Sequence, residues 1–254
     1  MRRVVVTGAS SGLGLALARH YLALGATVGA IARRAESLAA AFGDQPSAVR
    51  LAADVRDAAA MQTAASRFLD QAGAPDLVIG NAGVSVGTLT DHAADAERFR
   101  GVVETNLLGL VHTFQPFLAP MRAAGDGVLA GIASVAGLRG LPGAGAYSAS
   151  KAAAITYLES LRVELRGSGV DVVTVCPGYV RTPMTARNPY RMPFILDADE
   201  AARRIARIIA RRRRIAVVPW QMAIVARILR MLPPALYDAL FARAPRKPRA
   251  DDGS

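Results

Sequence analysis

Residues 4–14 read Val4-Val5-Val6-Thr7-Gly8-Ala9-Ser10-Ser11-Gly12-Leu13-Gly14, a short β-branched run that leads into a loop with three glycines. A helical pattern over residues 13–24 follows directly. Glycines let a backbone approach a ligand closely, and the first amides of a helix favour negative charge. A strand, a glycine loop and a helix in this order predict a site for the pyrophosphate of a dinucleotide. A tight strand-to-helix turn without a ligand is the alternative.

The rest of the chain alternates β-branched runs with longer helical patterns. This alternation predicts an α/β fold with a doubly wound, seven-stranded parallel sheet, the Rossmann fold, because runs that are apolar on both faces are typical of sheets covered by helices on both sides. We expect a single domain over residues 1–218 that contains the functional site. An amphipathic, basic, helical extension with a disordered end follows over residues 219–254. The expected strands are residues 4–6, 27–32, 49–53, 77–80, 128–132, 170–176 and 215–218.

Charge and composition exclude several classes of function. The formal net charge is +11, and residues 197–254 hold 13 of the 31 basic residues but only 6 of the 20 acidic ones. Few aromatic residues accompany this charge, so the sequence offers no platform for base stacking, and we expect no nucleic-acid partner. The three histidines are scattered and the chain has one cysteine, Cys176, so we expect no metal site. A single cysteine and a chain that opens on a strand rather than an export signal favour a cytoplasmic location.

The residues after the second expected strand indicate which dinucleotide binds. An aspartate or glutamate at this position would hold the ribose hydroxyls of NAD, but the sequence reads Ala32-Arg33-Arg34. A guanidinium group can bind a 2′-phosphate with paired hydrogen bonds, whereas a carboxylate would repel it. We therefore predict NADP(H) rather than NAD(H), with Arg33 as the main contact. Two solvated arginines at the start of a helix are the alternative.

The run Tyr147-Ser148-Ala149-Ser150-Lys151 contains one of only two lysines in the chain. A spacing of four places the phenol and the ammonium on one helix face. A cation about 4 Å from a phenolate, at an effective dielectric near 20, contributes roughly 4 kcal/mol, or about three pKa units. The spacing thus predicts a tyrosine with a lowered pKa that can exchange a proton near neutral pH. A packed tyrosine beside a solvated lysine is the alternative.

With these motifs in order, the chain resembles the short-chain dehydrogenase/reductase family, of the NADP-preferring type, from about residue 3 to about residue 218. The family pattern Thr-Gly-x-x-x-Gly-x-Gly falls on residues 7–14, and the Asn-Ala-Gly turn falls on residues 81–83. The resemblance implies an NAD(P)-dependent oxidoreductase acting on CH–OH groups. In one departure, Gly131-Ile132-Ala133-Ser134 stands where relatives often read Asn-Ile-Ser-Ser, which puts strand support in doubt but keeps the serine. The catalytic residues that the resemblance implies are Asn106, Ser134, Tyr147 and Lys151.

Each of these roles also fits the chemistry. Carbonyl reduction by hydride leaves negative charge on oxygen, so the site needs a proton donor and a second hydrogen-bond donor. Tyr147 would give the proton and Ser134 would bind the oxygen. Lys151 would lower the pKa of Tyr147 and hold the nicotinamide ribose, and Asn106 would fix a water that restores the proton. Ser134 could instead be a turn residue, and Asn106 could cap or bend a helix.

The cofactor site that we expect combines the glycine loop, the arginines and the residues carried over from the family. By the resemblance, Asp54 and Val55 lie by the adenine ring and Asn81 braces the central strands. The loop of Pro177, Gly178 and Thr182 lies over the nicotinamide carboxamide. The full set is Gly8, Ser10, Ser11, Gly12, Leu13, Gly14, Arg33, Arg34, Asp54, Val55, Asn81, Ala82, Gly83, Tyr147, Lys151, Pro177, Gly178, Val180 and Thr182.

The loops expected around the nicotinamide are residues 84–96, 135–145 and 179–196. They are mostly small or apolar, which predicts a hydrophobic carbonyl or alcohol as substrate, although the same residues could pack a lid. Four arginines in these loops could meet an anionic group: Arg139, Arg181, Arg187 and Arg191.

The C-terminal extension has more apolar surface than a monomer usually exposes. Residues 220–232 are interrupted by Arg227 and Arg230, too short and too charged to span a bilayer. This segment could cover the substrate entrance, pack on another subunit or lie on an anionic membrane, and we favour packing on protein over peripheral membrane contact. The resemblance implies a homodimer or homotetramer formed through the helices expected at residues 99–121 and 146–165.

The leading interpretation is an NADP(H)-dependent oxidoreductase. A reductase of 3-oxoacyl thioesters on an acidic carrier protein is the nearest variant, because a basic surface would attract that partner. A catalytically silent NADP-binding sensor would not need all four catalytic residues. A membrane-surface or nucleic-acid adaptor would explain the extension but not the glycine loop. The fold is shared by many specificities, so the sequence does not fix the substrate or the direction of reaction.

Overall fold

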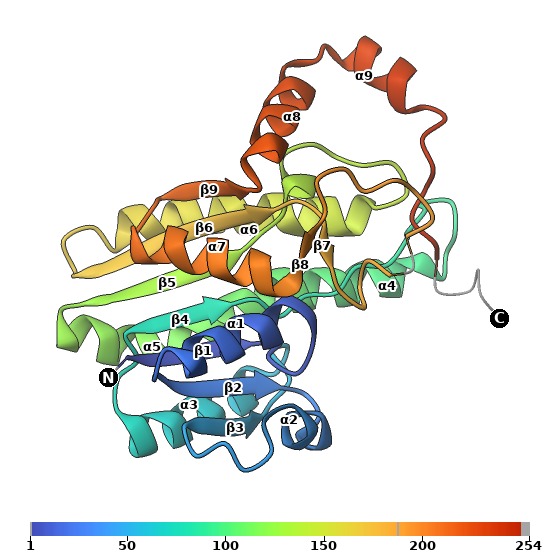
Figure 1. Ribbon diagram of the computed structural model, residues 1–254. Helices are drawn as coiled ribbons and strands as arrows, with labels where there is room; N and C mark the ends of the chain where they lie inside the picture. Colours follow the sequence, from blue (N-terminus) through green and yellow to red (C-terminus); the bar gives the residue numbers. More distant parts are fainter. Residues whose placement is uncertain (1, 187, 250–254) are drawn as a thin grey trace.

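The computed structural model describes residues 2–186 and 188–249, and its centre is a seven-stranded parallel sheet with helices on both faces (Figure 1). The strand order is β3-β2-β1-β4-β5-β6-β9. This order confirms the predicted doubly wound α/β fold, and every predicted strand is present to within two residues. The strands are β1 Arg3–Thr7, β2 Thr27–Ala32, β3 Ala48–Ala52, β4 Leu77–Gly80, β5 Gly127–Ile132, β6 Val170–Pro177 and β9 Ile215–Val218.

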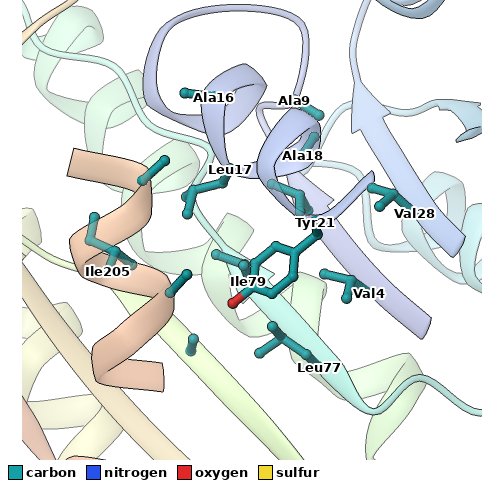
Figure 2. Packing of buried hydrophobic residues seen from close by; sticks show 14 of the residues in the cluster. Val4, Ala9, Ala16, Leu17, Ala18, Tyr21, Val28, Leu77, Ile79 and Ile205 are labelled. Atoms are coloured by element: carbon teal, nitrogen blue, oxygen red, sulfur yellow. The ribbon is translucent and has the colours of Figure 1, made fainter. Parts of the chain in front are cut away.

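Alternate residues of each strand enter two separate cores. Val4 and Val6 face one core and Val5 faces the other, and all three are fully buried. Figure 2 shows the first core, where Leu17 and Tyr21 pack with side chains of β1 and β4 and with Ile205 of a later helix, α7 Ala198–Ala210. Because both faces are covered, continuous Val-rich runs are stable in this sheet. Helices α1 Gly12–Ala23, α2 Ala35–Phe42 and α7 Ala198–Ala210 cover the first face; α3 Ala58–Ala72, α5 Gly109–Ala124 and α6 Gly145–Glu164 cover the second.

The helix expected at residues 99–121 is an interrupted rod. It begins as α4 Asp95–Val103, passes through a π-helical turn at Glu104–Leu108 and continues as α5. A π turn inserts an extra residue into a helix and is often found at functional sites. Asn106 lies in this turn and is buried.

A second sheet of two short strands was not expected. It pairs β7 Val180–Arg181 with β8 Leu196–Asp197, and the Arg181 and Asp197 side chains form an ion pair of 2.8 Å. Strands of two residues leave no periodic pattern in a sequence. The pair closes the loop that follows β6.

The C-terminal extension forms two helices that stand apart from the layers, α8 Trp220–Met231 and α9 Pro234–Phe241 (Figure 1). We expected the extension over residues 219–254 to have a disordered end; within this extension, residues 245–249 return to the domain. They do so because Arg249 pairs with Asp95 and the Pro248 carbonyl accepts a hydrogen bond from the Gly87 amide. For residues 250–254 the expectation lies outside the described residues.

Candidate active site

The glycine loop between β1 and α1 is shaped for a close backbone approach. Gly8 and Gly12 have positive φ angles of 69° and 54°, which L side chains rarely adopt. A Cβ atom on Gly14 would lie 2.2 Å from the Gly8 carbonyl oxygen. Ser11 precedes α1 without a side-chain capping bond, so within the described part of the chain no side chain satisfies the first amides of the helix. This loop and helix start suit a phosphate group.

Thr7 and Asn81 join the ends of the two central strands. The Thr7 hydroxyl accepts hydrogen bonds from the amides of Asn81 at 3.1 Å and Ala82 at 3.2 Å. The Asn81 side-chain amide donates to the Thr7 carbonyl at 3.0 Å. These bonds hold the glycine loop beside the Asn-Ala-Gly turn, and Thr7 is completely buried.

A single cavity of about 300 Å³ runs along the carboxyl ends of the strands and is lined by every residue that we predicted to bind the cofactor. Ser134 also lines it, whereas Asn106 does not. The sequence interpretation missed several lining residues. Val84 and Met184 belong to loops that we expected around the substrate and not around the cofactor. Thr105 had no sequence pattern that pointed to the cavity, because it belongs to the unexpected π turn. The lining residues outside our prediction are Ala32, Ala53, Val84, Thr105, Ile132, Ala133, Pro183, Met184 and Thr185.

The arginines after β2 lie at one end of this cavity. Arg33 is exposed, and among the described residues its side chain makes no hydrogen bond or ion pair. Arg34 donates to the Ser37 hydroxyl at 3.0 Å. The neighbouring carboxylate, Asp54, is paired with Arg56 at 2.7 Å, and that hydrogen-bonded guanidinium holds the pKa of Asp54 below its ordinary value. An incoming phosphate would thus meet an available guanidinium beside a neutralised carboxylate.

Ser134, Tyr147 and Lys151 meet at the other end of the cavity. Ser134 precedes a short 3₁₀ helix, Val135–Gly137, and its hydroxyl oxygen accepts the Ala136 amide at 3.1 Å. This leaves the Ser134 hydroxyl hydrogen able to donate elsewhere. Tyr147 and Lys151 come from the first turns of α6; Tyr147 is half-buried and Lys151 is only 4% exposed.

The lowered tyrosine pKa that we predicted is wrong for this structure. Burial raises the pKa of the Tyr147 phenol, and a hydrogen bond with Ser134 only partly opposes this effect. The Lys151 ammonium nitrogen lies 5.9 Å from the centre of the Tyr147 ring and donates to the Ile132 carbonyl at 2.7 Å. Burial also lowers the pKa of Lys151 to about 8. The physical reason is that loss of water around each group disfavours its charged form.

Asn106 lies behind this cluster and connects two elements. Its side-chain oxygen accepts the Val84 amide at 2.8 Å, and its side-chain nitrogen donates to the Val84 carbonyl at 3.0 Å and to the Ser150 hydroxyl at 2.9 Å. Ser150 in turn donates to the Tyr147 carbonyl at 2.8 Å. The Asn106 side chain therefore fixes the loop after β4 against α6. Sequence reasoning missed Ser150, although its spacing of three from Tyr147 places it near the same helix face.

The four arginines expected near the substrate lie in different settings. Arg139 stacks on the Tyr237 ring at 4.3 Å, and Arg181 pairs with Asp197. Arg191 is exposed, and Arg187 lies outside the described residues. Two of the four arginines, Arg139 and Arg181, therefore already contact other residues of the protein.

Within residues 2–186 and 188–249, no group of three or more His, Cys, Asp or Glu side chains could hold a metal ion. In the same described part of the chain, no helix has the length and hydrophobicity needed to cross a membrane.

Known proteins are similar to this chain in sequence and in architecture. Residues 2–191 match the family described as short chain dehydrogenase. An uncharacterized oxidoreductase of Myxococcus xanthus is 41% identical over 249 residues, which cover 95% of this chain and 97% of the relative. The 2-(R)-hydroxypropyl-CoM dehydrogenase of Xanthobacter autotrophicus is 38% identical over 195 residues, or 72% of this chain and 76% of that protein.

Solved structures agree with this result. A short-chain dehydrogenase/reductase from Burkholderia phymatum in complex with NAD superposes with a TM-score of 0.82 at 25% identity and covers 97% of both chains. Similar structures are described as complexes with NADH, NAD and NADPH. Further sequence relatives are named ketoacyl reductases.

Proposed function

This chain belongs to the short-chain dehydrogenase family and is an oxidoreductase acting on alcohol and ketone groups, and we propose that it is an NADP(H)-dependent enzyme for mostly hydrophobic carbonyl or alcohol substrates. The observation that carries the proposal is the cavity lined at one end by Arg33 and at the other by Ser134, Tyr147 and Lys151. Incubation with NADPH and a panel of ketones, followed by NADPH absorbance, tests it. Failure to oxidise NADPH with any ketone or thioester would count against it.

The residues present fit the cofactor. The uncapped start of α1 and the Gly14 cradle, which a Cβ would fill, suit the pyrophosphate, and Lys151 and Tyr147 stand where the nicotinamide ribose would be held. When bound, NADPH supplies the hydride that reduces a carbonyl carbon.

We assign the proton chemistry to three side chains. A phenol has an ordinary pKa of about 10, so Tyr147 is protonated at neutral pH and would give its phenolic proton to the substrate oxygen. Ser134 would donate a hydrogen bond to the same oxygen, since its own oxygen lone pair already accepts the Ala136 amide. Lys151, oriented by the Ile132 carbonyl, would stabilise the negative charge that develops on the phenol oxygen. Asn106 would position α6 through Ser150.

The preference for NADP(H) is supported by the end of β2. No carboxylate follows Ala32, and the exposed guanidinium of Arg33 has no competing partner among the described residues. The neighbouring Asp54 is engaged by Arg56 and so would repel a 2′-phosphate less than an unpaired carboxylate.

Replacing Arg33 with alanine is expected to weaken NADPH binding about 10- to 100-fold, because a charge-assisted hydrogen bond contributes about 1.5–3 kcal/mol. NADH binding should change little, since NADH has no 2′-phosphate. Titration calorimetry with both nucleotides measures this. Arg67→Ala is the matched control, because Arg67 is an exposed arginine on α3, away from the cavity. Equal weakening of NADPH and NADH by Arg33→Ala would contradict the assignment.

A 3-oxoacyl thioester is the second candidate substrate. Relatives named ketoacyl reductases and the net charge of +11, which would attract an acidic carrier protein, favour it. The same NADPH assay with a 3-oxoacyl thioester and a simple ketone of equal chain length separates the two candidates.

We also propose a cytoplasmic homodimer or homotetramer. Family members are typically oligomeric, and Phe99 and Leu108 on the α4–α5 rod and Val163 on α6 expose apolar surface. The buried, lone Cys176, whose pKa burial raises to about 11, suits a compartment where thiols stay reduced.

The outer face of α8 supports peripheral contact with an anionic membrane. Trp220, Ile224, Ile228 and Met231 form an exposed apolar stripe with a spacing of three or four residues, and α8 has no acidic residue. Arg227 and Arg230 are exposed beside the stripe. Two copies pairing through this face would bring their arginines together, whereas anionic lipid headgroups would neutralise them. The sequence alone favoured packing on protein; on this charge pattern we propose peripheral membrane contact through α8.

Flotation with phosphatidylserine vesicles is expected to recover the wild-type protein, and high salt should reduce the recovery. The double variant Ile224→Ser, Ile228→Ser should lose most of it, whereas Val163→Ser, which changes an exposed valine on α6, should not. If neither high salt nor the double substitution changes the recovery of protein with the vesicles, membrane contact through α8 is contradicted. Loss of an oligomer in the double variant, seen by light scattering, would favour a second copy as the occupant.

A further inference from the structure

The chain end at residues 245–249 crosses two loops that border the candidate active site. The Pro248 carbonyl accepts a hydrogen bond from the Gly87 amide at 3.0 Å, and a Cβ on Gly87 would lie 2.3 Å from the Lys247 carbonyl oxygen. A Cβ on Gly143 would lie 2.7 Å from the Arg246 Cβ. Both contacts require a glycine, because any side chain at Gly87 or Gly143 would collide with residues 246–248. The chain end therefore packs directly against the backbone of the two loops.

The two loops also contact each other beside this segment. The Thr88 amide donates to the Gly143 carbonyl at 3.1 Å, and the Ala146 amide donates to the Thr88 hydroxyl at 3.3 Å. The loop after β4, the loop before α6 and the chain end therefore form one structure. Figure 1 shows this return of the chain from α9 to the start of α4.

A buried ion pair anchors the segment. Arg249 donates to Asp95 at 2.9 Å and 3.3 Å, and the Asp95 side chain is only 2% exposed at the start of α4. Asp95 also accepts the Leu89 amide at 2.9 Å and pairs with Arg98. Its hydrogen bonds with Arg249 and Leu89 hold the pKa of Asp95 well below its usual range. We expect the ion pair between Asp95 and Arg98 to remain when Arg249 is replaced.

A second anchor lies on α9. The Tyr237 hydroxyl donates to the Gly140 carbonyl, and the Arg139 guanidinium stacks over the Tyr237 ring while donating to the Leu232 carbonyl at 3.4 Å. Tyr237 is 8% exposed although α9 stands apart from the domain. The extension is therefore fastened to the loop before α6 as well as to α4.

The anchors affect the candidate active site because the loop after β4 and the loop before α6 both begin at residues that line its cavity. Val84, which lines the cavity, precedes Gly87 by three positions, and Gly140 and Gly143 lie between Ser134 and Tyr147. Residues 245–249 do not line the cavity themselves. We infer that they form a fixed outer wall behind the two loops of the substrate chamber, held by the Asp95–Arg249 pair, and that this wall restricts the enzyme to compact carbonyl or alcohol substrates. The inference rests on the proposed oxidoreductase function. Arg249 is a positioning residue, since it acts through the wall and does not touch the cavity.

The variant Arg249→Ala tests this inference, with Arg243→Ala as its control. Arg243 is exposed on the same extension and makes no hydrogen bond or ion pair with the described residues. Two properties are measured: hydrogen exchange at the Gly87 amide, and the ratio of kcat/KM for a ten-carbon to a four-carbon 2-ketone with NADPH. Arg249→Ala is expected to speed Gly87 exchange at least 10-fold and to raise the ratio about 10-fold or more, the scale on which hydrophobic pockets discriminate by size. The Kd for NADPH should stay unchanged, and Arg243→Ala should leave all three values at the wild-type level.

A chain truncated after Ala244 provides a second variant and should behave like Arg249→Ala. Unchanged Gly87 exchange in the truncated chain would show that the segment does not pack on this loop, and would overturn the inference. Faster exchange with an unchanged ratio of kcat/KM would overturn the role in specificity. If the wild type turns over neither ketone, the proposed function is contradicted. If only the inference about residues 245–249 is wrong, the wild type still turns over ketones.

Discussion

The variant Tyr147→Phe is expected to lose about 10³-fold in kcat for carbonyl reduction, within the range of 10²- to 10⁴-fold that general acid catalysis contributes. Phenylalanine retains the half-buried ring, so the cavity wall and α6 should keep their structure. Only the hydroxyl, the proton donor that we assign, is lost. The Kd for NADPH should therefore change less than about 5-fold, because loss of one neutral hydrogen bond contributes about 1 kcal/mol or less here.

Steady-state kinetics and NADPH titration of the same preparation measure both parts of this prediction. Tyr157→Phe is the control, since Tyr157 lies on the same helix but packs against the second core. It should keep wild-type turnover. Near-normal reduction by Tyr147→Phe would remove this residue from the mechanism, and equal losses in both variants would indicate a general effect on α6.

The variant Lys151→Met is expected to lose activity and to change the pH dependence of stability. Its kcat/KM should fall about 10²-fold, because removing a charge that stabilises the developing phenolate raises the barrier by about 3 kcal/mol at an effective dielectric near 20. Wild-type reduction should also decline as the pH rises through about 8, where the buried ammonium loses its proton. The variant should not show that decline.

The stability effect follows from the lowered lysine pKa. The folded value of about 8 lies below the ordinary value of 10.5, so between these pH values the unfolded chain binds more protons than the folded chain. The contribution of Lys151 to folding is therefore least favourable below pH 8 and improves as the pH rises to 10.5. Urea unfolding should show the wild type gaining about 2 kcal/mol relative to Lys151→Met between pH 7.5 and 9.5. A constant difference between the two proteins over this range would contradict the burial of a titrating lysine.

Local patterns predicted the sheet, and they also predicted many of the residues that line the cavity. β-branched runs such as residues 4–6 form strands because both faces of the sheet are covered, and residues at the strand ends converge in any doubly wound sheet. The glycine loop was predictable because Gly8, Gly12 and Gly14 meet steric demands that other residues would violate.

The features that sequence reasoning missed depend on long-range geometry. The i, i+4 spacing placed Tyr147 and Lys151 on one face of a helix but could not show that the ammonium donates to Ile132, 19 positions away. The π turn at Asn106 has no periodic signal. The Asp95–Arg249 pair joins residues 154 positions apart. Residues 245–249 are all proline, arginine or lysine, and nothing in this composition distinguished a docked segment from a disordered one.

Transfer of a deuterium label tests the central claim most directly. Wild-type protein is incubated with NADPH that carries deuterium at the reactive C4 position, together with a panel of hydrophobic ketones, and the alcohol product is analysed by mass spectrometry. A directly transferred hydride predicts one deuterium on the carbinol carbon for each NADPH consumed, with no detectable product from Tyr147→Phe over the same time. NADPH consumption without label in any alcohol, or equal labelling by Tyr147→Phe, would contradict the account.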